Sequence, residues 1–475
     1  MNDFADTIAA IATPLGEGGV AVIRISGDHA FAVGDKCFLP VGKNSCKPSA
    51  ATSHTIQYGR VVRAGQLVDE VLCAVMRAPR TYTREDVVEI TCHGGILAAK
   101  TVLDTILENG ARLAEPGEFT KRAFLNGRLD LAQAEAVMDL IHSRTELALM
   151  AANEQLAGKF SLRINQLRDD LMNTLAHIEA YIDFPDEDIA PDTRQQLEER
   201  LERGIAFMDE LLRTANEGQI LRRGIRAAIV GRPNAGKSSL LNQLLGHNRA
   251  MVSTIPGTTR DTIEEAANIR GLPVIFIDTA GLREAQDELE LEGIRRSHES
   301  LARAELILHV LDASEPLTPA DEKHLGEFAG KKRILVCNKI DLPRELELPN
   351  DRVSTPLPAD GANGVTRPTE VMIVDVCCVS GQGMEALKDA IKALVWSGEI
   401  KSEMLQVMIN SRHQDALRRA REASALTLEA LRTDLTPDLV AVDLYVAVNA
   451  IGEIVGQTTT EDLLDSIFSQ FCIGK

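Results

Sequence analysis

The sequence predicts a multidomain protein in which an N-terminal α+β domain precedes a discontinuous α-helical bundle and an inserted α/β domain. Its 475 residues are enough for two to four domains at about 100 to 200 residues each. After residue 129 the composition turns to Ala, Leu, Glu and Gln, which favours long helices. From residue 225 onward, apolar runs alternate with glycine loops and helical segments, which is typical of an α/β fold.

Residues 1–122 are expected to form the α+β domain. Apolar runs at 20–25 and 87–90 predict strands. Glycine-rich segments at 16–19 and 94–95 predict the turns between the elements, so this part of the chain is expected to be compact.

Residues 123–222 and 396–475 are expected to form the two parts of one helical domain. Between 129 and 182 there is no proline and one glycine, and apolar residues recur every three or four positions. Such a stripe predicts one face of an α-helix packed in a bundle. Pro185, in the segment 184–189, is expected to break this helix, because proline lacks an N–H and disfavours helical geometry in the residue before it. The stripe consists of Leu156, Phe160, Ile164, Leu167, Leu171, Leu175, Ile178 and Ile182.

Further helices are expected on both sides of the α/β domain. A charged helix should run to about Glu217, and helical patterns return at 404–431, 440–454 and 461–471. The basic residues on these segments, Arg222 and Arg412 among them, are expected to lie on solvated helix faces.

Residues 223–395 are expected to form the inserted α/β domain. Its apolar runs are separated by helical segments, which predicts a parallel sheet. A stretch rich in Pro, Asp and Asn at 344–369 is expected to be a surface insertion, to which no function is assigned. The strands are predicted at 227–230, 274–277, 306–311 and 334–337.

Charge and composition exclude several classes of function. The chain has 51 Lys and Arg against 70 Asp and Glu, so its formal net charge of −19 argues against a protein that coats nucleic acid through a basic surface. Aromatic residues make up 4%, so base stacking is not expected as the main mode of binding. The eight cysteines form no C-x-x-C pair, and no apolar run approaches the roughly 20 residues of a membrane span, so a cytoplasmic protein is expected.

A phosphate-binding loop is predicted at 231–238, where G-R-P-N-A-G-K-S matches G-x-x-x-x-G-K-[ST] between a strand and a helix. The backbone N–H groups and the helix N-terminus would cradle phosphate, Lys237 would reach the outer phosphates and the Ser238 hydroxyl would bind Mg²⁺. The sequence D-T-A-G at 278–281 follows a later strand, which would place a carboxylate near the metal and a glycine N–H near the γ-phosphate.

Two further motifs indicate the base. The sequence N-K-I-D at 338–341 resembles the guanine-specificity motif of GTPases, in which the aspartate accepts hydrogen bonds from guanine, and 379–381 fits the loop that closes over the base. The four motifs in this order favour GTP over ATP. The expected GTP contacts are Asn234, Ala235, Gly236, Lys237, Ser238, Ser239, Ser253, Thr254, Ile255, Pro256, Gly257, Thr258, Thr259, Asp278, Thr279, Ala280, Gly281, Asn338, Lys339, Asp341 and Ser380.

The first switch is expected at 253–261, with the Thr259 hydroxyl as the second Mg²⁺ ligand beside Ser238. Many GTPases orient the attacking water with a glutamine directly after D-x-x-G, but this chain has Leu282 there, which cannot hydrogen-bond a water. Another residue must therefore position the water. The acidic run at 284–292 offers candidates, most of which are expected to lie on a solvated helix start.

These motifs, the 184–189 break and the terminal F-C-I-G-K together closely resemble the MnmE (TrmE) family of tRNA modification GTPases. The resemblance implies a Ras-like P-loop GTPase domain whose hydrolysis is stimulated by K⁺ when two such domains dimerise. It implies Asn234, Ser253, Ile255 and Thr258 as K⁺ ligands. Glu290 matches the glutamate that positions the water and would act with Lys237 and Thr259, while Glu292 is its main competitor.

The resemblance also implies that the N-terminal domain binds tetrahydrofolate, as a 5,10-methylene or 5-formyl derivative, and holds a homodimer together. The matching folate contacts are Arg24, Glu85, Arg128 and Lys475. Cations suit the folate carboxylates and a carboxylate suits pterin N–H donors. At position 128 the family pattern has lysine and this chain has arginine, which keeps the charge and changes the geometry.

The function implied is K⁺-dependent GTP hydrolysis in a heterotetramer or larger complex with the FAD-dependent partner MnmG (GidA). That complex would install a carboxymethylaminomethyl or aminomethyl group at C5 of the wobble uridine of certain tRNAs. The alternative is a non-catalytic GTPase switch in ribosome assembly. The tRNA set, the final side group, the choice of glycine or ammonium as donor and the tRNA docking site stay open, and the context of Cys472 favours a packed side chain over a catalytic one.

Overall fold

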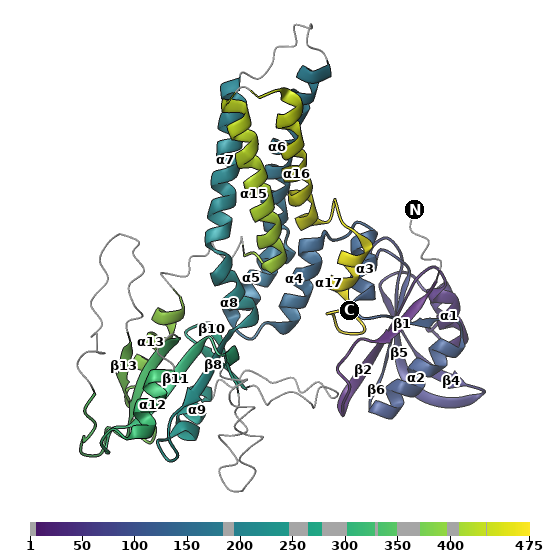
Figure 1. Ribbon diagram of the computed structural model, residues 1–475. Coiled ribbons are helices and arrows are strands. Elements are labelled where there is room, and N and C mark those ends of the chain that lie inside the picture. The colour runs from purple at the N-terminus through teal and green to yellow at the C-terminus, as the bar shows by residue number, and fades with distance from the viewer. Residues whose placement is uncertain are drawn as a thin grey trace.

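The computed structural model describes residues 6–183, 194–246, 265–277, 302–327, 331–348, 371–396, 408–433 and 435–475. An N-terminal sheet with its helices and a second sheet lie on either side of a long helical bundle (Figure 1). The C-terminus lies close to the N-terminal sheet, so the last helix returns to the start of the chain (Figure 1). This multidomain arrangement confirms the predicted fold class, while the boundaries after residues 122, 222 and 395 stay predictions.

The N-terminal sheet has the strand order β3-β4-β5-β6-β2-β1-β7. The predicted strands at 20–25 and 87–90 are confirmed as parts of β2 and β6, which pair antiparallel. Helices α1 and α2 cover one face and bury alternate strand residues such as Ile23 and Ile25. The elements are β1 (Ile8–Ile11), β2 (Gly18–Ser26), α1 (Ala30–Cys37), β3 (Phe38–Pro40), β4 (Thr55–Arg63), β5 (Gln66–Met76), β6 (Val87–Gly94), α2 (Ile96–Glu108) and β7 (Arg112–Leu113), with a short 3₁₀ helix at Pro48–Ala50.

The bundle combines helices from both predicted parts of the helical domain. Phe160, Ile164 and Leu171 of α6 are buried in one core with Leu444 and Ile451 of α16. None of the described helices is long and apolar enough to cross a membrane. The helices are α3 (Glu118–Leu125), α4 (Leu131–His142), α5 (Glu146–Leu156), α6 (Lys159–Asp183), α7 (Arg194–Arg213), α8 (Ala215–Arg223), α15 (Ser411–Arg432), α16 (Pro437–Val455) and α17 (Glu461–Phe468).

Three helix predictions need correction. The apolar stripe is interrupted, because Gly158 adopts the left-handed conformation at φ 82° and separates Leu156 in α5 from the rest in α6. The charged helix ends at Arg213, and the separate helix α8 continues past Glu217. The helix expected from residue 404 begins at Ser411, after Asn410 and the side chain of residue 413 form a capping box. The break at 184–189 lies outside the described residues.

The second sheet has the order β13-β12-β11-β8-β10-β9, and its described neighbours pair in parallel except β9 with β10. All four predicted strands are confirmed. The predicted surface insertion begins inside the fold, because Leu346 is buried with Leu311 and Cys337; residues 349–370 lie outside the described ranges. The elements are β8 (Ile225–Val230), α9 (Lys237–Leu245), β9 (Glu265–Ile269), β10 (Leu272–Phe276), β11 (Leu306–Asp312), α12 (Pro319–Glu327), β12 (Lys332–Asn338), β13 (Met372–Asp375) and α13 (Met384–Val395).

A buried charge network joins α4 to the start of α15. Glu135 of α4 accepts two hydrogen bonds from Arg412, each at 2.9 Å, and its Oε2 lies 2.8 Å from His413 Nε2. Arg412 also donates to the carbonyls of residues 453 and 454 at the end of α16. Arg412 therefore connects three helices, which corrects the expectation that it lies on a solvated face.

This network predicts a loss of stability in mild acid. His413 is fully buried, and burial lowers its pKa from 6.5 to about 4 although Glu135 opposes the shift. The unfolded histidine takes up a proton first, so the free energy of unfolding should fall by up to about 3 kcal/mol as the pH drops from about 6.5 toward 4. Thermal midpoints at pH 7, 6 and 5 measure this. His413→Gln should reduce the dependence of the thermal midpoint on pH. Part of the dependence should remain, because burial also lowers the pKa of His309 to about 4. A variant with the same pH dependence as the wild type would contradict the prediction.

Candidate nucleotide and folate sites

The predicted phosphate-binding loop lies at the carboxyl edge of the second sheet, where ligands bind in open α/β sheets. It connects β8 to α9, and the ends of β11 and β12 lie beside it in the parallel sheet. Asn234 and Ser239 are exposed, Ala235 is buried, and Lys237 and Ser238 begin the helix. The helix N-terminus points its free N–H groups at this loop, as anion binding requires.

Two glycines of the loop are required by close contacts. Gly231 adopts φ 147°, and a Cβ there would lie 2.3 Å from the carbonyl oxygen of Val310. Gly236 adopts φ 100°, and its Cβ would lie 2.1 Å from the side-chain nitrogen of Asn338. Any larger residue would push the loop away from the strand ends, so the motif glycines are explained by packing as well as by conformation.

Lys237 lies inside the loop that it is expected to serve. Its ammonium donates to the carbonyls of Gly231 and Arg232, each at 2.8 Å, and burial lowers its pKa. A cation held at the centre of the loop meets any phosphate that the loop N–H groups bind.

The guanine motif joins three loops at the same sheet edge. Asn338 donates to the carbonyl of Ala235 at 2.9 Å and accepts from the N–H of Cys378 at 3.1 Å, so it fastens the phosphate loop to the loop after β13. Lys339 adopts φ 67° and pairs with Asp312 at 2.5 Å. The only sequence signal for Asp312 as a partner is that it ends a strand. The strand ends thus position the next residues of the motif.

Asp341 is exposed at the end of this motif. One of its oxygens accepts a hydrogen bond from the thiol of Cys377 at 3.1 Å, and the N–H of Ser380 lies 3.5 Å from the same sulfur. Cys377 therefore links the carboxylate to the loop that is expected to close over the base. Sequence patterns alone gave no reason to place this cysteine at the site.

Other predicted nucleotide and cation residues lie outside the described residues: Ser253, Thr254, Ile255, Pro256, Gly257, Thr258, Thr259, Asp278, Thr279, Ala280, Gly281, Glu290 and Glu292. Their roles stay predictions. The described residues hold no group of three or more His, Cys, Asp or Glu arranged to bind a metal.

Three of the four predicted folate residues surround one segment of the N-terminal domain. The guanidinium groups of Arg24 and Arg128 lie 5.6 Å and 4.7 Å from the ring centre of Tyr82. Arg128 also donates to the Tyr82 carbonyl at 2.9 Å, and Arg24 pairs with Glu89 at 2.7 Å. The sequence did not single out Tyr82, although its ring is the surface shared by both cations.

Glu85 is held in place from two sides. It accepts from the Ser26 hydroxyl at 2.7 Å and pairs with Arg122 at 3.2 Å. Arg122 is fully buried and also pairs with Asp6 and Glu118, at 2.7 Å and 2.9 Å. A buried arginine with three carboxylate partners rigidifies this corner of the domain.

The C-terminal tail reaches the same domain. Ile473 forms a β-bridge with Pro116, and a Cβ on Gly474 would lie 2.5 Å from the carbonyl oxygen of Ile11. Ile11 lies on β1, the strand that pairs with the one carrying Arg24, so Lys475 ends beside that strand pair. Cys472 is exposed, which corrects the expectation of a packed side chain.

A hollow in the N-terminal domain does not coincide with the predicted folate residues. Its volume is about 300 Å³, and it lies between the loop at 13–18 and the start of α2. Its lining includes Gly94, Gly95 and Ile96, with Glu17 as the charged residue. None of Arg24, Glu85, Arg128 and Lys475 lines it.

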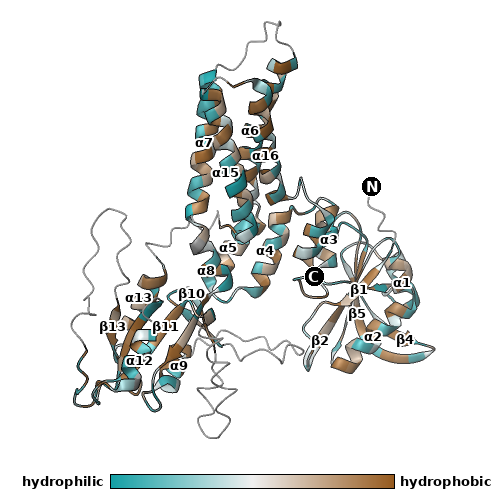
Figure 2. Ribbon diagram, in the orientation of Figure 1, coloured by the Kyte–Doolittle hydropathy of each residue, from teal (hydrophilic) through white to brown (hydrophobic). Residues whose placement is uncertain are grey.

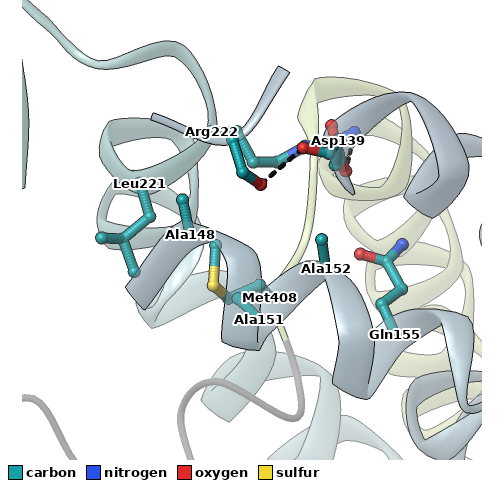
Figure 3. A pocket seen from close by; sticks show the side chains of 9 residues that line it. Asp139, Ala148, Ala151, Ala152, Gln155, Leu221, Arg222 and Met408 are labelled. Carbon is teal, nitrogen blue, oxygen red and sulfur yellow. Dashed lines mark hydrogen bonds and ion pairs between the residues drawn. The ribbon is translucent and has the colours of Figure 1, made fainter. Parts of the chain in front are cut away.

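A half-buried ion pair marks the junction where the chain enters the second sheet. Arg222, three residues before β8, pairs with Asp139 of α4 at 2.6 Å, and burial raises the pKa of Asp139 although this cation is beside it. Figure 3 shows the two side chains meeting beside a gap lined by Ala148, Ala152 and Met408. The gap measures about 10 Å³, room for one water at most, so it is a packing defect and not a ligand site.

Comparisons with known proteins cover the whole chain. The model of the MnmE helical domain matches residues 131–472, and the model of the GTP-binding protein TrmE N-terminus matches residues 7–128. A protein of Geobacillus kaustophilus named tRNA modification GTPase MnmE is 47% identical over 479 residues, covering 100% of both chains. Its namesake in Thermoanaerobacter pseudethanolicus is 44% identical over 472 residues, covering 99% of both. Among solved structures, Aquifex aeolicus Era matches with a TM-score of 0.25 and 28% identity over 42% of this chain and 66% of that chain.

Proposed function

This chain belongs to the MnmE family of tRNA modification GTPases, and we propose that its K⁺-dependent GTP hydrolysis drives modification of the wobble uridine together with the FAD-dependent partner MnmG. As a member of this family, the chain is a GTP-hydrolysing enzyme. The observation that carries the proposal is the joint presence, in one chain, of the phosphate loop with its guanine motif and of the Arg24, Arg128 and Glu85 cluster. The added group is a carboxymethylaminomethyl or aminomethyl group.

The residues of the phosphate loop fit the cations in this proposal. Hydroxyl oxygens such as those of Ser238 and Thr259 are hard ligands that suit Mg²⁺, which, when bound, offsets the charge of the outer phosphates. Asn234 suits K⁺ because its exposed side chain makes no hydrogen bond to any residue that the structure describes, and its φ of 63° places it at the turn of the loop. We assign the remaining K⁺ ligands to Ser253, Ile255 and Thr258. Lys237 holds the phosphates from within the loop.

Glu290 is proposed as the residue that positions the attacking water, because Leu282 cannot do so. Glu290→Ala should keep GTP binding and lower the single-turnover rate by about 100-fold, the usual contribution of a positioned acid or base. Glu292→Ala is the matched control and should hydrolyse GTP at nearly the wild-type rate. If Glu292→Ala is the slow variant, the assignment moves to Glu292.

The folate cofactor is assigned to the N-terminal cluster. Two arginines on one aromatic ring supply cations for the folate carboxylates, and the half-buried Glu85 supplies an acceptor for pterin N–H groups. The chemistry of the donor set therefore fits. A bound methylene-tetrahydrofolate supplies the one-carbon unit, while these side chains bind and orient it.

Folate binding is expected to depend on Arg24. Arg24→Ala should weaken the affinity for 5-formyl-tetrahydrofolate by about tenfold or more, since one charge-assisted hydrogen bond is worth about 1.5–3 kcal/mol. Titration calorimetry measures this, with Arg63→Ala as the control, because Arg63 on the same sheet forms an exposed pair with Glu108 of α2. Wild-type chain that binds no folate, together with a normal wobble uridine in cells lacking the gene, would instead favour the ribosome-assembly switch.

The homodimer is assigned to the N-terminal sheet. Tyr58 and Leu72 are a cross-strand pair on β4 and β5, and they are 43% and 45% exposed, with Ile56 at 67% beside them. An exposed apolar group on a sheet is typical of a protein interface. Light scattering of the intact chain measures the expected dimer mass.

A further inference from the structure

The outer face of α16 carries an exposed apolar stripe. Leu439, Val442 and Val446 follow one another at helical spacing and are 57%, 59% and 48% exposed. The inner face of the same helix buries Leu444, Ile451 and their neighbours against α6 and α15. Helix α16 is thus apolar on both sides (Figure 2), and a helix of that kind is normally covered on both.

Side chains of the neighbouring helices extend this stripe. Arg419 of α15 pairs with Glu453 of α16, which fixes the two helices antiparallel and brings Leu426, 52% exposed, level with Val446. On the other side, the Tyr445 hydroxyl donates to Glu179 of α6. We call the exposed side chains of Leu426, Leu439, Val442, Tyr445 and Val446 the α16 stripe.

The charges around the α16 stripe are mainly negative. Helix α16 contains Asp438, Asp443 and Glu453 and no lysine or arginine. Glu422 and Glu429 of α15 lie along the same edge and form no ion pair with any residue that the structure describes. Arg419 of α15 pairs with Glu453 and Asp415, and the exposed Arg418 lies one turn before Glu422, so the unpaired acidic side chains outnumber the cations. The stripe is therefore an apolar strip with an acidic rim.

This rim limits what can cover the stripe. Phosphates of an RNA would be repelled by the acidic side chains. A second copy meeting the stripe face to face would oppose one acidic rim to another, which costs binding free energy. A protein surface with an apolar centre and a lysine or arginine rim is complementary in both respects.

We propose that the α16 stripe is the docking surface for a partner protein whose contact face is apolar at its centre and basic at its rim. The inference rests on the proposed function, in which the flavin-dependent partner is the protein that must join this chain. Apolar contacts at the stripe hold the complex, and the acidic rim speeds the encounter and sets its orientation.

The test measures binding of purified FAD-dependent partner to the intact chain. Val442→Glu with Val446→Glu should weaken the affinity at least about tenfold, and Asp443→Lys should weaken it with a smaller dependence on salt. Leu162→Glu is the matched control, since Leu162 is 71% exposed on α6 of the same bundle and away from the stripe. The GTPase rate and thermal midpoint of every variant should equal those of the wild type, which separates docking from folding.

Each other outcome overturns the assignment. Unchanged partner affinity in the double variant would show that the partner binds elsewhere. If the double variant no longer forms the dimer, the stripe binds a second copy of the chain. If the double variant alone no longer binds tRNA, the stripe binds RNA. If the wild-type chain does not bind the FAD-dependent partner at all, the proposed partnership fails, and the assignment fails with it.

Discussion

Asp341→Asn is expected to change the nucleotide preference of this enzyme from GTP to XTP. A carboxylate accepts hydrogen bonds from the N1 and N2 groups of guanine, and two charge-assisted bonds are worth about 3–6 kcal/mol together. GTP affinity should therefore fall by about 10² to 10⁴. Xanthine carries a carbonyl in place of the N2 amino group, and the asparagine amide can donate to it. Asp341 is exposed beside the loop that contains Cys377, so the substituted side chain can reach a base without repacking a core.

Competition between GTP and XTP in a hydrolysis assay measures this change. The matched control is Asp375→Asn, because Asp375 lies at the end of the adjacent strand and forms an exposed pair with Arg344. The control should keep the preference for GTP. If Asp341→Asn hydrolyses GTP as well as the wild type and does not accept XTP, the guanine motif does not read the base in this protein.

Replacing K⁺ with Na⁺ is expected to slow GTP hydrolysis by about 10³-fold, the lower end of what a cation at this position contributes in related reactions. The proposed ligands are amide and carbonyl oxygens, and the smaller Na⁺ would need them to move inward. Asn234 has its amide available for this role. Asn234→Ala in K⁺ should therefore be nearly as slow as the wild type in Na⁺.

The assay compares turnover in KCl and NaCl at equal ionic strength and saturating GTP. Asn242→Ala provides a control for a general effect of removing an asparagine, because Asn242 is exposed on α9, one turn beyond the loop. Equal wild-type rates in both salts would show that GTP hydrolysis does not depend on K⁺. A variant at Asn234 that keeps its full K⁺ response would remove this residue from the ligand set.

Local patterns predicted much of the fold. Apolar runs between glycine loops predicted four strands of the second sheet, because such a pattern depends only on residues that are close in sequence. These strands lie at 227–230, 274–277, 306–311 and 334–337. The phosphate loop and guanine motif were predicted for the same reason. The structure adds that Gly231 and Gly236 are needed for packing against other strand ends, which depends on residues distant in sequence.

Long-range partners could not be predicted. Arg412 and Arg222 have the pattern of surface residues, yet they pair with Glu135 and Asp139, which lie one helical turn apart on α4. The pairing depends on where the chain leaves and re-enters the helical bundle. No local pattern encodes that, and the same holds for Tyr82 between Arg24 and Arg128.

Mass spectrometry of wobble nucleosides tests whether this GTPase takes part in modifying the wobble uridine. Total tRNA would be taken from cells lacking the gene and from the same cells expressing either the wild-type chain or Lys237→Ala. The modified uridine should disappear without the gene, return with the wild type, and stay absent with Lys237→Ala, because the variant lacks the cation at the centre of the phosphate loop. A fully modified wobble uridine in cells without the gene would contradict the account.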